Sequence, residues 1–215
     1  MTKININEIF YSISGEADSM GLPMVFVRFS GCNLNCSWCD TKYAKDSYQP
    51  MTPNKILEEI SKFGCSNVLI TGGEPMMQPE GLHELICLLL IKRYKVWVET
   101  NGSYNIHNFW ASQIRPDLTW IPDLKMPSSG MNHHNEFKNL NYCNQVKCVV
   151  ADDTDLEYAT HFLRGLNYEG VAWFNPVHGK MDLKKLAEWI KKQKQPNWRV
   201  GIQLHKLIWG KKRGV

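Results

Sequence analysis

Short, continuous apolar segments alternate with amphipathic segments of helical length, and this alternation limits the possible folds more than any other feature of the chain. The predicted strands span residues 24–30, 67–71, 95–100, 118–124, 145–151 and 170–175, with a last strand at 199–204. The predicted helices span residues 52–63, 79–93, 106–114, 155–164 and 182–194. Repeated βα units of this kind form a parallel sheet. The strands are too few for a closed eight-stranded barrel, so we predict an α/β fold, an incomplete (β/α)6 TIM-like barrel.

The overall composition narrows the class of protein. No repeat or linker divides the 215 residues, so we predict one domain over 1–215. A net charge of +4 is too small to argue for a nucleic-acid partner. The longest apolar run, 85–91, is far shorter than the roughly 20 residues that span a bilayer, and residues 1–15 lack a signal-peptide pattern. With seven cysteines, we expect a cytoplasmic protein in a reducing compartment, with no membrane partner.

Three cysteines lie in the loop at 31–41, directly after the first predicted strand. Cys32, Cys36 and Cys39 have the spacing C-x3-C-x2-C. Three thiolates can hold three irons of a 4Fe-4S cluster and leave the fourth open to a small molecule. A structural zinc site is an alternative, but Asp40 is the only further ligand nearby. The remaining cysteines are expected to be small buried hydrophobic residues: Cys65, Cys87, Cys143 and Cys148.

A glycine-rich motif, Thr71-Gly72-Gly73-Glu74-Pro75, ends the second predicted strand. Glycines allow a backbone to approach a ligand closely, and Glu74 can accept a hydrogen bond from an ammonium group. In parallel βα folds the functional side chains gather at the carboxyl ends of the strands. The cysteine loop and this motif both lie at such ends, so we expect them to form one site.

Together these motifs resemble those of the radical S-adenosylmethionine (SAM) superfamily. The cysteine spacing, with Trp38 before the third cysteine, is similar to the superfamily signature, and the glycine motif resembles its GGEP motif. Over nearly its whole length the chain further resembles the 7-carboxy-7-deazaguanine synthase family. The matching segments are 7–16, 25–34, Cys39-Asp40-Thr41, Glu99-Thr100-Asn101-Gly102 and Gln203-Leu204-His205-Lys206.

The resemblance implies a role for each matching position. Cys32, Cys36 and Cys39 would hold the 4Fe-4S cluster, and Thr41 would bind Mg2+. The residues around SAM would be Trp38, Cys39, Asp40, Gly73, Glu74, Asn101, Lys125, Asn175, Pro176, Val177 and His178. The residues that contact a pterin substrate would be Ile13, Ser14, Gly15, Arg28 and Thr71. Arg28 would pair with the substrate carboxylate, and Glu99 is the candidate for proton transfer.

The implied activity is that of a radical SAM carbon-nitrogen lyase. It would convert 6-carboxy-5,6,7,8-tetrahydropterin to 7-carboxy-7-deazaguanine with loss of ammonia, in 7-deazapurine and queuosine biosynthesis. A flavodoxin-type reductant and a homodimer are further expectations. A glycyl-radical-enzyme activating protein shares the cysteine spacing and is the closest alternative. A non-catalytic iron-sulfur electron carrier is another, but it would not need a SAM site.

Four segments depart from the family pattern. Ser14-Gly15-Glu16-Ala17 stands where the family has Gln-Gly-Glu-Gly, Asp123-Leu124-Lys125 where some members have Ser-Pro-Lys, and Asn175-Pro176 where the family has Gln-Pro. A C-terminal extension covers about 205–215. Away from the site, we expect His133 and His134 in an exposed turn, and Trp173 and Phe174 in the core.

Overall fold

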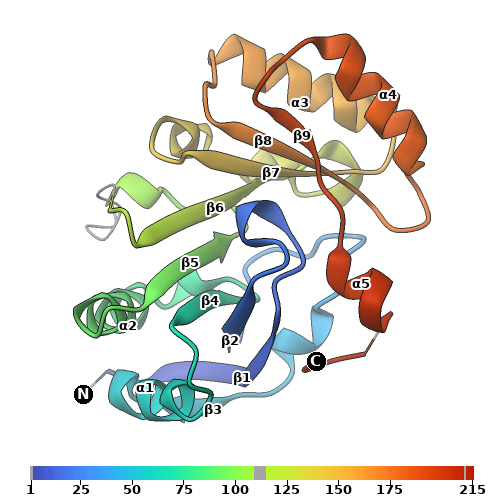
Figure 1. Cartoon of the computed structure of the whole chain (residues 1–215). Helices are drawn as coiled ribbons and strands as arrows, with labels where there is room; N and C mark the ends of the chain where they lie inside the picture. The colour runs from blue at the N-terminus through green and yellow to red at the C-terminus, as the bar shows by residue number, and fades with distance from the viewer. Residues whose placement is uncertain (1, 109–114, 211) are drawn as a thin grey trace.

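A curved, open, nine-stranded sheet forms the framework of the computed structural model, which describes residues 2–108, 115–210 and 212–215 (Figure 1). The strands are β1 (Ile4–Ile13), β2 (Pro23–Phe29), β3 (Gln49–Met51), β4 (Asn67–Gly72), β5 (Lys95–Thr100), β6 (Leu118–Leu124), β7 (Gln145–Val150), β8 (Val171–Pro176) and β9 (Trp198–Val200). Their order is β3-β1-β2-β4-β5-β6-β7-β8-β9. The strands from β2 to β9 in this order pair in parallel, whereas β1 is antiparallel to β2 and β3. This arrangement confirms the incomplete parallel barrel.

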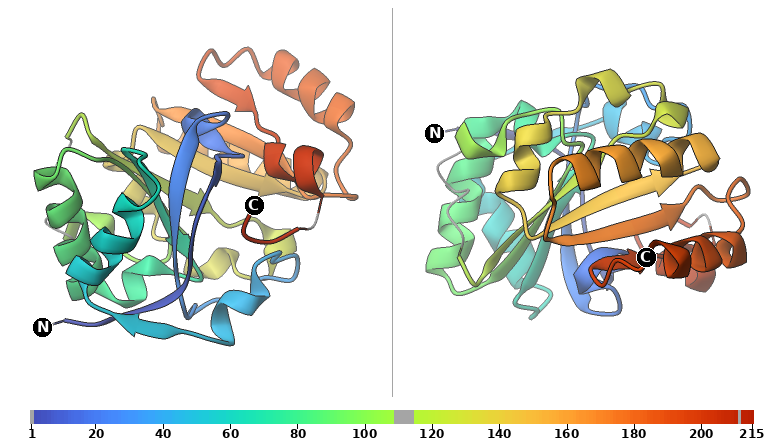
Figure 2. Two further views of the ribbon diagram at one scale, coloured as in Figure 1. Left: turned by 60° about the horizontal axis from the view of Figure 1, so that its bottom comes forward. Right: turned by 90° about the horizontal axis from the view of Figure 1, so that it is seen from above.

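Helices cover one face of the sheet in two groups. One group is α1 (Pro53–Ser61) and α2 (Pro79–Ile91), and the other is α3 (Asp153–Gly165) and α4 (Leu183–Gln193). The short helix α5 (Leu204–Trp209) lies apart from both groups, near the β1–β2 hairpin (Figure 2). Side chains that accept a backbone N–H open three of them: Thr52 for α1, Asp152 for α3 and Asp182 for α4. In Figure 1, α1 and α2 lie at the lower left and α3 and α4 at the upper right. None of the described helices is long and apolar enough to cross a lipid bilayer.

The interior is divided into three apolar clusters. One packs α1 and α2 against β1, β2, β4 and β5, and a second packs α3 and α4 against β7 and β8. The third is small and joins Ala17, Ile121 and Trp173 with Trp97. Because side chains alternate along a strand, Trp173 lies on the opposite face of β8 from Phe174, which packs under α4. The third cluster therefore fills the inner face of the curved sheet, and both residues are buried as expected.

The structure corrects several predicted elements. β1 and β3 were missed, and a register shift in β1 between Ile6 and Glu8 interrupts the alternation that would have marked it as a strand. The last predicted strand, 199–204, was wrong beyond Val200, since α5 begins at Leu204. Of the predicted helix 106–114, residues Ile106–Asn108 form a 3-10 helix, and 109–114 lie outside the described residues.

Candidate active site

Polar side chains line the inner face of the sheet at the carboxyl ends of β2 and of β4 to β7. Arg28 on β2 is in register with Thr71 on β4, and Asp123 on β6 is in register with Lys147 on β7. Residues in register on neighbouring strands share a face. Glu99 on β5 joins them, because the Thr71 hydroxyl donates to its Oε2 at 2.9 Å. On β5 and β6, Glu99 and Asp123 lie two residues beyond the apolar Trp97 and Ile121, so the polar positions form a layer above the inner apolar cluster.

Lys147 is the centre of this layer, which we call the charged layer: Glu16, Glu99, Asp123 and Lys147. Its Nζ lies 2.8 Å from Glu16 Oε2, 3.2 Å from Glu99 Oε1 and 3.4 Å from Asp123 Oδ1. Burial alone lowers the pKa of Lys147, but the three carboxylates raise it well above its ordinary value. The sequence prediction missed this residue. The sequence did contain a sign of its importance: Lys147 lies inside a predicted buried strand, and charged side chains in such positions are almost always paired with an opposite charge.

Arg28 is held by an acid and two rings. Its Nε donates to Glu8 Oε1 at 2.7 Å, and the Tyr43 hydroxyl donates to the same oxygen at 2.9 Å. The guanidinium lies 5.9 Å from the ring centre of Phe10 and 5.8 Å from that of Tyr43. Arg28 contacts Glu8 through Nε, and its two terminal nitrogens take no part in this contact. This geometry is compatible with the predicted pairing of Arg28 with a ligand carboxylate.

The cysteine loop packs directly against the glycine motif. A Cβ atom on Gly73 would lie 2.0 Å from the carbonyl oxygen of Gly31 and 3.0 Å from Cys32 Cβ, so only glycine fits there. The Asn101 amide approaches Cys32 Sγ at 3.7 Å, and the backbone N–H of Leu34 approaches it at 3.5 Å. The loop, the turn after β4 and the turn after β5 therefore meet at one end of the sheet, as predicted.

The donor set of the loop fits an iron-sulfur cluster. Cys32 and Cys39 are partly exposed and Cys36 is buried, and all three are free thiols. The pKa of the Cys36 thiol is raised above its ordinary value, because the effect of burial exceeds the opposing effect of the nearby Lys125 charge. No three His, Cys, Asp or Glu side chains in the described ranges gather around one point that could hold a single ion. A cubane binds each thiolate at a different iron, so its cysteines need not converge in that way.

The remaining cysteines divide into two pairs. Cys143 and Cys148 are buried, as predicted, and burial raises the pKa of Cys143 to about 12. Cys65 and Cys87 are only half-buried, so the prediction was wrong for these two. His133 and His134 are exposed in a 3-10 turn, as expected.

Glu74 is fully buried and joins two loops. It accepts hydrogen bonds from Met76 N at 2.9 Å, Thr100 Oγ1 at 2.8 Å and Asn101 N at 2.6 Å. Burial raises its pKa to about 7, and the three hydrogen bonds oppose this rise. In this structure the carboxyl group fastens the turn after β4 to the end of β5. A contact between Glu74 and the SAM ammonium group stays a prediction.

Trp38 and Lys125, both predicted near SAM, lie together. Lys125 Nζ is 5.7 Å from the centre of the Trp38 ring and 2.5 Å from Asp123 Oδ2. The Trp38 indole donates to Ser128 Oγ at 3.1 Å, which fixes the ring. Lys125 is buried, so it places a positive charge between the cysteine loop and the charged layer.

The predicted SAM residues that follow β8 differ in exposure. Asn175 is fully buried, and a Cβ on Gly201 would lie 2.4 Å from its Oδ1. Within the described part of the chain this Oδ1 accepts no hydrogen bond, although it is buried. A buried acceptor of this kind usually has a partner, and a bound ligand could supply it. Val177 is also buried, Pro176 is partly exposed and His178 is exposed.

Residues 13–16 lie under the C-terminal segment. Ser14 is buried and its hydroxyl lies 2.7 Å from that of Ser19. Leu204 N donates to Gly15 O at 3.0 Å, and a Cβ on Gly15 would lie 2.2 Å from His205 Nδ1. Figure 2 shows α5 close to the N-terminal β1–β2 hairpin in both views. The segment after β9 thus bridges to the end of β1, across the opening between the first and last parts of the sheet.

Asp40 and Thr41 form an oxygen-rich position beside the loop. Thr41 Oγ1 donates to Asp40 Oδ1 at 2.9 Å, and Lys206 Nζ lies 2.7 Å from Asp40 Oδ2. Desolvation raises the pKa of the Asp40 carboxyl, but the hydrogen bond and charge of Lys206 lower it to about 2. A hydroxyl next to an ionised carboxylate offers the oxygen ligands that Mg2+ prefers.

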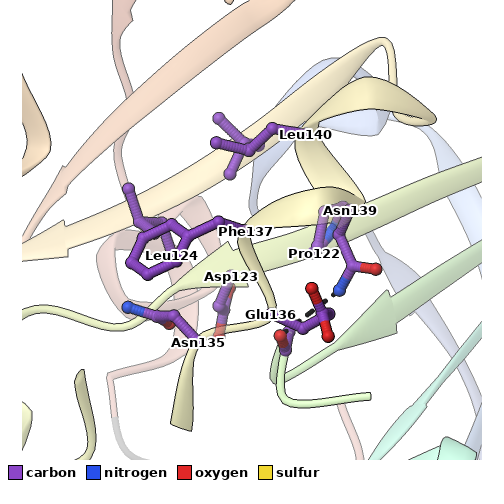
Figure 3. Close-up of a pocket in the computed structure, with 10 residues that line it drawn as sticks. Pro122, Asp123, Leu124, Asn135, Glu136, Phe137, Asn139 and Leu140 are labelled. Atoms are coloured by element: carbon purple, nitrogen blue, oxygen red, sulfur yellow. Dashed lines mark hydrogen bonds between the residues drawn. The ribbon is translucent and has the colours of Figure 1, made fainter. Parts of the chain in front are cut away.

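A separate small pocket lies between β6 and residues 135–140 (Figure 3). Pro122 and Leu124 line it, together with Phe137 and Leu140. Along β6 these two residues face away from the Asp123 side chain, because neighbours on a strand point to opposite faces. The pocket therefore lies mainly on the outer face of the sheet, and Asp123 is the one member of the charged layer among its lining residues.

Comparison with known proteins identifies relatives over the whole chain. The Radical SAM superfamily model matches residues 26–109. The 7-carboxy-7-deazaguanine synthase of Clostridium acetobutylicum is 38% identical over 97% of this chain and 97% of its own length. Those of Chlorobaculum tepidum and Thermoplasma acidophilum are each 36% identical, over 96% and 98% of this chain and 94% and 99% of their own lengths.

A solved structure supports the fold. The crystal structure of QueE from Escherichia coli superimposes with a TM-score of 0.76, covers 94% of this chain and 95% of its own, and is 24% identical in sequence. At this level of identity the likeness concerns the fold. The open, mostly parallel sheet is therefore an architecture already observed in a crystal.

Proposed function

The chain belongs to the 7-carboxy-7-deazaguanine synthase family of radical SAM enzymes, and from this premise we propose that it converts 6-carboxy-5,6,7,8-tetrahydropterin to 7-carboxy-7-deazaguanine, with loss of ammonia. The reaction class is a carbon-nitrogen lyase. The observation that carries the proposal is that Lys125 links the three-cysteine loop to the charged layer, since it lies over the Trp38 ring of the loop and pairs with Asp123 of the layer.

Cys32, Cys36 and Cys39 hold the 4Fe-4S cluster in this proposal, and SAM occupies the space near Trp38, Lys125 and Asn175. When bound, these cofactors supply a radical that removes a hydrogen atom from the substrate. The protein contributes the geometry. The lysine over the Trp38 ring carries a fixed positive charge, and the buried Asn175 Oδ1 is an acceptor for a cofactor donor.

The charged layer and Arg28 form the substrate site in this proposal. Arg28, oriented by Glu8, pairs with the substrate carboxylate through its terminal nitrogens. Thr71 contributes a hydroxyl, and Glu99 accepts or returns a proton during rearrangement. Ile13, Ser14 and Gly15 contact the pterin mainly through backbone, since the Ser14 hydroxyl already pairs with Ser19. Thr41 would hold Mg2+, which would neutralise substrate charge when bound.

Its physiological setting is also part of the proposal. A reduced cluster needs an electron donor, for which a flavodoxin-type protein is suitable. We place the enzyme in the cytoplasm, as one domain and as a homodimer, acting in a 7-deazapurine or queuosine pathway. The pterin, rather than a partner protein, is the expected hydrogen donor.

The test is anaerobic incubation of the reconstituted, reduced protein with SAM, Mg2+ and 6-carboxytetrahydropterin. Mass spectrometry then measures 5'-deoxyadenosine and 7-carboxy-7-deazaguanine. Formation of both supports the proposal, and a Cys36→Ala variant should form neither. Cleavage of SAM without a changed pterin would reject the substrate. A loaded cluster that never cleaves SAM would point to an electron carrier instead.

A further inference from the structure

Lys147 contacts three carboxylates that come from three different parts of the chain. Glu16 follows β1, Glu99 is on β5 and Asp123 is on β6, while Lys147 itself is on β7. An ammonium group has three N–H donors, which equals the number of carboxylates around it. The Asp123 contact is the longest, at 3.4 Å, and is an ion pair rather than a hydrogen bond. No other lysine in the described ranges has three carboxylate partners.

Each of these carboxylates also has a second contact, made by its other oxygen. Gln203 Nε2 donates to Glu16 Oε1 at 2.8 Å, and Thr71 Oγ1 donates to Glu99 Oε2 at 2.9 Å. Lys125 Nζ lies 2.5 Å from Asp123 Oδ2. Each carboxylate is thus held at both oxygens, which restricts its rotation. Lys147 is the one partner that all three share.

The three outer contacts lead to different parts of the proposed site. Thr71 belongs to the proposed substrate contacts, Lys125 to the SAM side, and Gln203 to the segment that bridges to the end of β1. A change at Lys147 would therefore affect all three at once. A change at any one outer residue would release a single carboxylate oxygen.

We infer that Lys147 is a positioning residue, whose ammonium group fixes Glu16, Glu99 and Asp123 around the pterin site; this inference rests on the function proposed above. Lys147 does not transfer a proton itself. It holds the Glu99 carboxylate in one orientation, so that this group is within reach of the substrate proton. Asp123 supplies a further negative charge between Lys147 and Lys125.

Removing the ammonium group leaves three mostly buried carboxylates, whose side chains are 14 to 21% exposed, with Lys125 as the remaining nearby cation. Like charges at close range and in a buried site raise the pKa of a carboxyl group. In a Lys147→Met variant at least one of Glu16, Glu99 and Asp123 should take up a proton near neutral pH. A Lys147→Arg variant keeps the charge, but its planar guanidinium cannot direct donors to three partners from one point.

The experiment compares Lys147→Met and Lys147→Arg with wild type, as cluster-loaded protein. A Lys185→Met variant is the matched control, because Lys185 forms an exposed ion pair with Asp153. Three quantities are measured: iron content, SAM cleavage without pterin, and kcat and KM for the pterin between pH 6 and 9. Wild-type turnover is established first. If wild type forms no deazaguanine product, the proposed function fails; if it does, the variants test this inference alone.

We expect Lys147→Met to keep its iron and its SAM cleavage within about twofold, while kcat for the product falls by about 100-fold, the scale of one proton-transfer residue. Its kcat should also rise with pH as the carboxyl groups ionise again, unlike that of wild type. Lys147→Arg should recover about tenfold of the lost kcat. Wild-type kcat in Lys147→Met would overturn the inference. So would equal loss of product, iron and SAM cleavage in both variants, since that pattern means a purely structural role.

If the Lys147→Met variant does not fold, the same measurements on Lys147→Arg test the inference by themselves. A drop in kcat with SAM cleavage retained supports the positioning role. Unchanged kinetics, or parallel loss of both reactions, overturns it.

Discussion

Two acids at the ends of neighbouring strands, the buried Glu74 and the partly exposed Glu99, are stabilised in opposite ways. Glu74 accepts hydrogen bonds from a hydroxyl and two backbone N–H groups, and burial raises its pKa to about 7. Glu99 lies beside a lysine as well as a hydroxyl. Neutral donors fasten a loop without fixing the charge of the acid, whereas an ammonium group fixes both charge and orientation. The first arrangement suits structure, and the second suits a proposed proton-transfer site.

The largest expected effect is on Glu99. A Glu99→Gln variant keeps the shape and can still accept from Thr71, but it cannot take up a proton or pair with Lys147. We expect kcat for the pterin to fall by about 1,000-fold with SAM cleavage retained. Steady-state kinetics with product detection measures this, and Glu157→Gln, an exposed acid, is the control. A loss below tenfold would show that Glu99 is not the proton-transfer residue.

A Glu74→Ala variant tests the structural side of the comparison. It leaves the N–H groups of Met76 and Asn101 and the Thr100 hydroxyl without their acceptor in a buried site. We expect the free energy of unfolding to fall by about 3 kcal/mol, because each buried donor without an acceptor destabilises the folded state. Urea unfolding measures this, with the exposed Glu58→Ala as the control. Equal stability of the two variants would mean that Glu74 does not fasten the two loops.

The raised pKa of Glu74 also predicts a pH dependence of stability. Its folded-state pKa of about 7 lies above the ordinary value of 4.5, so the folded state holds the proton more tightly. The stabilisation is therefore complete below pH 4.5 and is lost as the pH rises through 7. Between pH 5 and 8, wild type should lose on the order of 2 kcal/mol relative to Glu74→Gln, whose side chain does not titrate. Parallel unfolding curves of the two proteins across this range would contradict the raised pKa.

Asp123 should give the smallest effect. An Asp123→Ser variant loses the contact to Lys125, while Lys147 keeps its two glutamates. We expect KM for SAM to rise about fivefold, the scale of one side-chain contact, with little change in kcat. The exposed Asp153→Ser is the control. A larger loss in kcat than in KM would mean that Asp123 acts on the substrate side instead.

The sequence predicted the parallel strands and main helices because strands buried on both faces are continuous apolar runs and the helices have clear caps. β1 was not predicted because a register shift breaks the alternation of apolar and polar residues along the strand. α5 was not predicted: its first residue, Leu204, was assigned to the end of a strand and the rest to a C-terminal extension, although Leu204, Leu207 and Ile208 have helical spacing.

The sequence predicted which loops meet where each motif lies within one loop, and it missed the contacts that depend on strand register. The cysteine loop, the glycine motif and Asn101 meet as expected because each follows a strand of the same parallel sheet. Lys147 was missed because its role depends on contacts with Glu16, Glu99 and Asp123. These residues are far apart in the sequence, and only the fold brings them together. The pairing of Arg28 with Glu8 likewise depends on the antiparallel β1, which was not predicted.

The bridge from the segment after β9 to the end of β1 also bears on how the protein matures. Gln203 and Glu16, which it joins, are separated by 187 residues in sequence. Contacts over such a span form late in folding, and a ribosome delivers the N-terminal strands first. A nascent chain can therefore complete its cysteine loop and most of its sheet while residues 13–16 are still uncovered. The contacts that cover residues 13–16 are then among the last to form, so an unfinished chain lacks this side of its site.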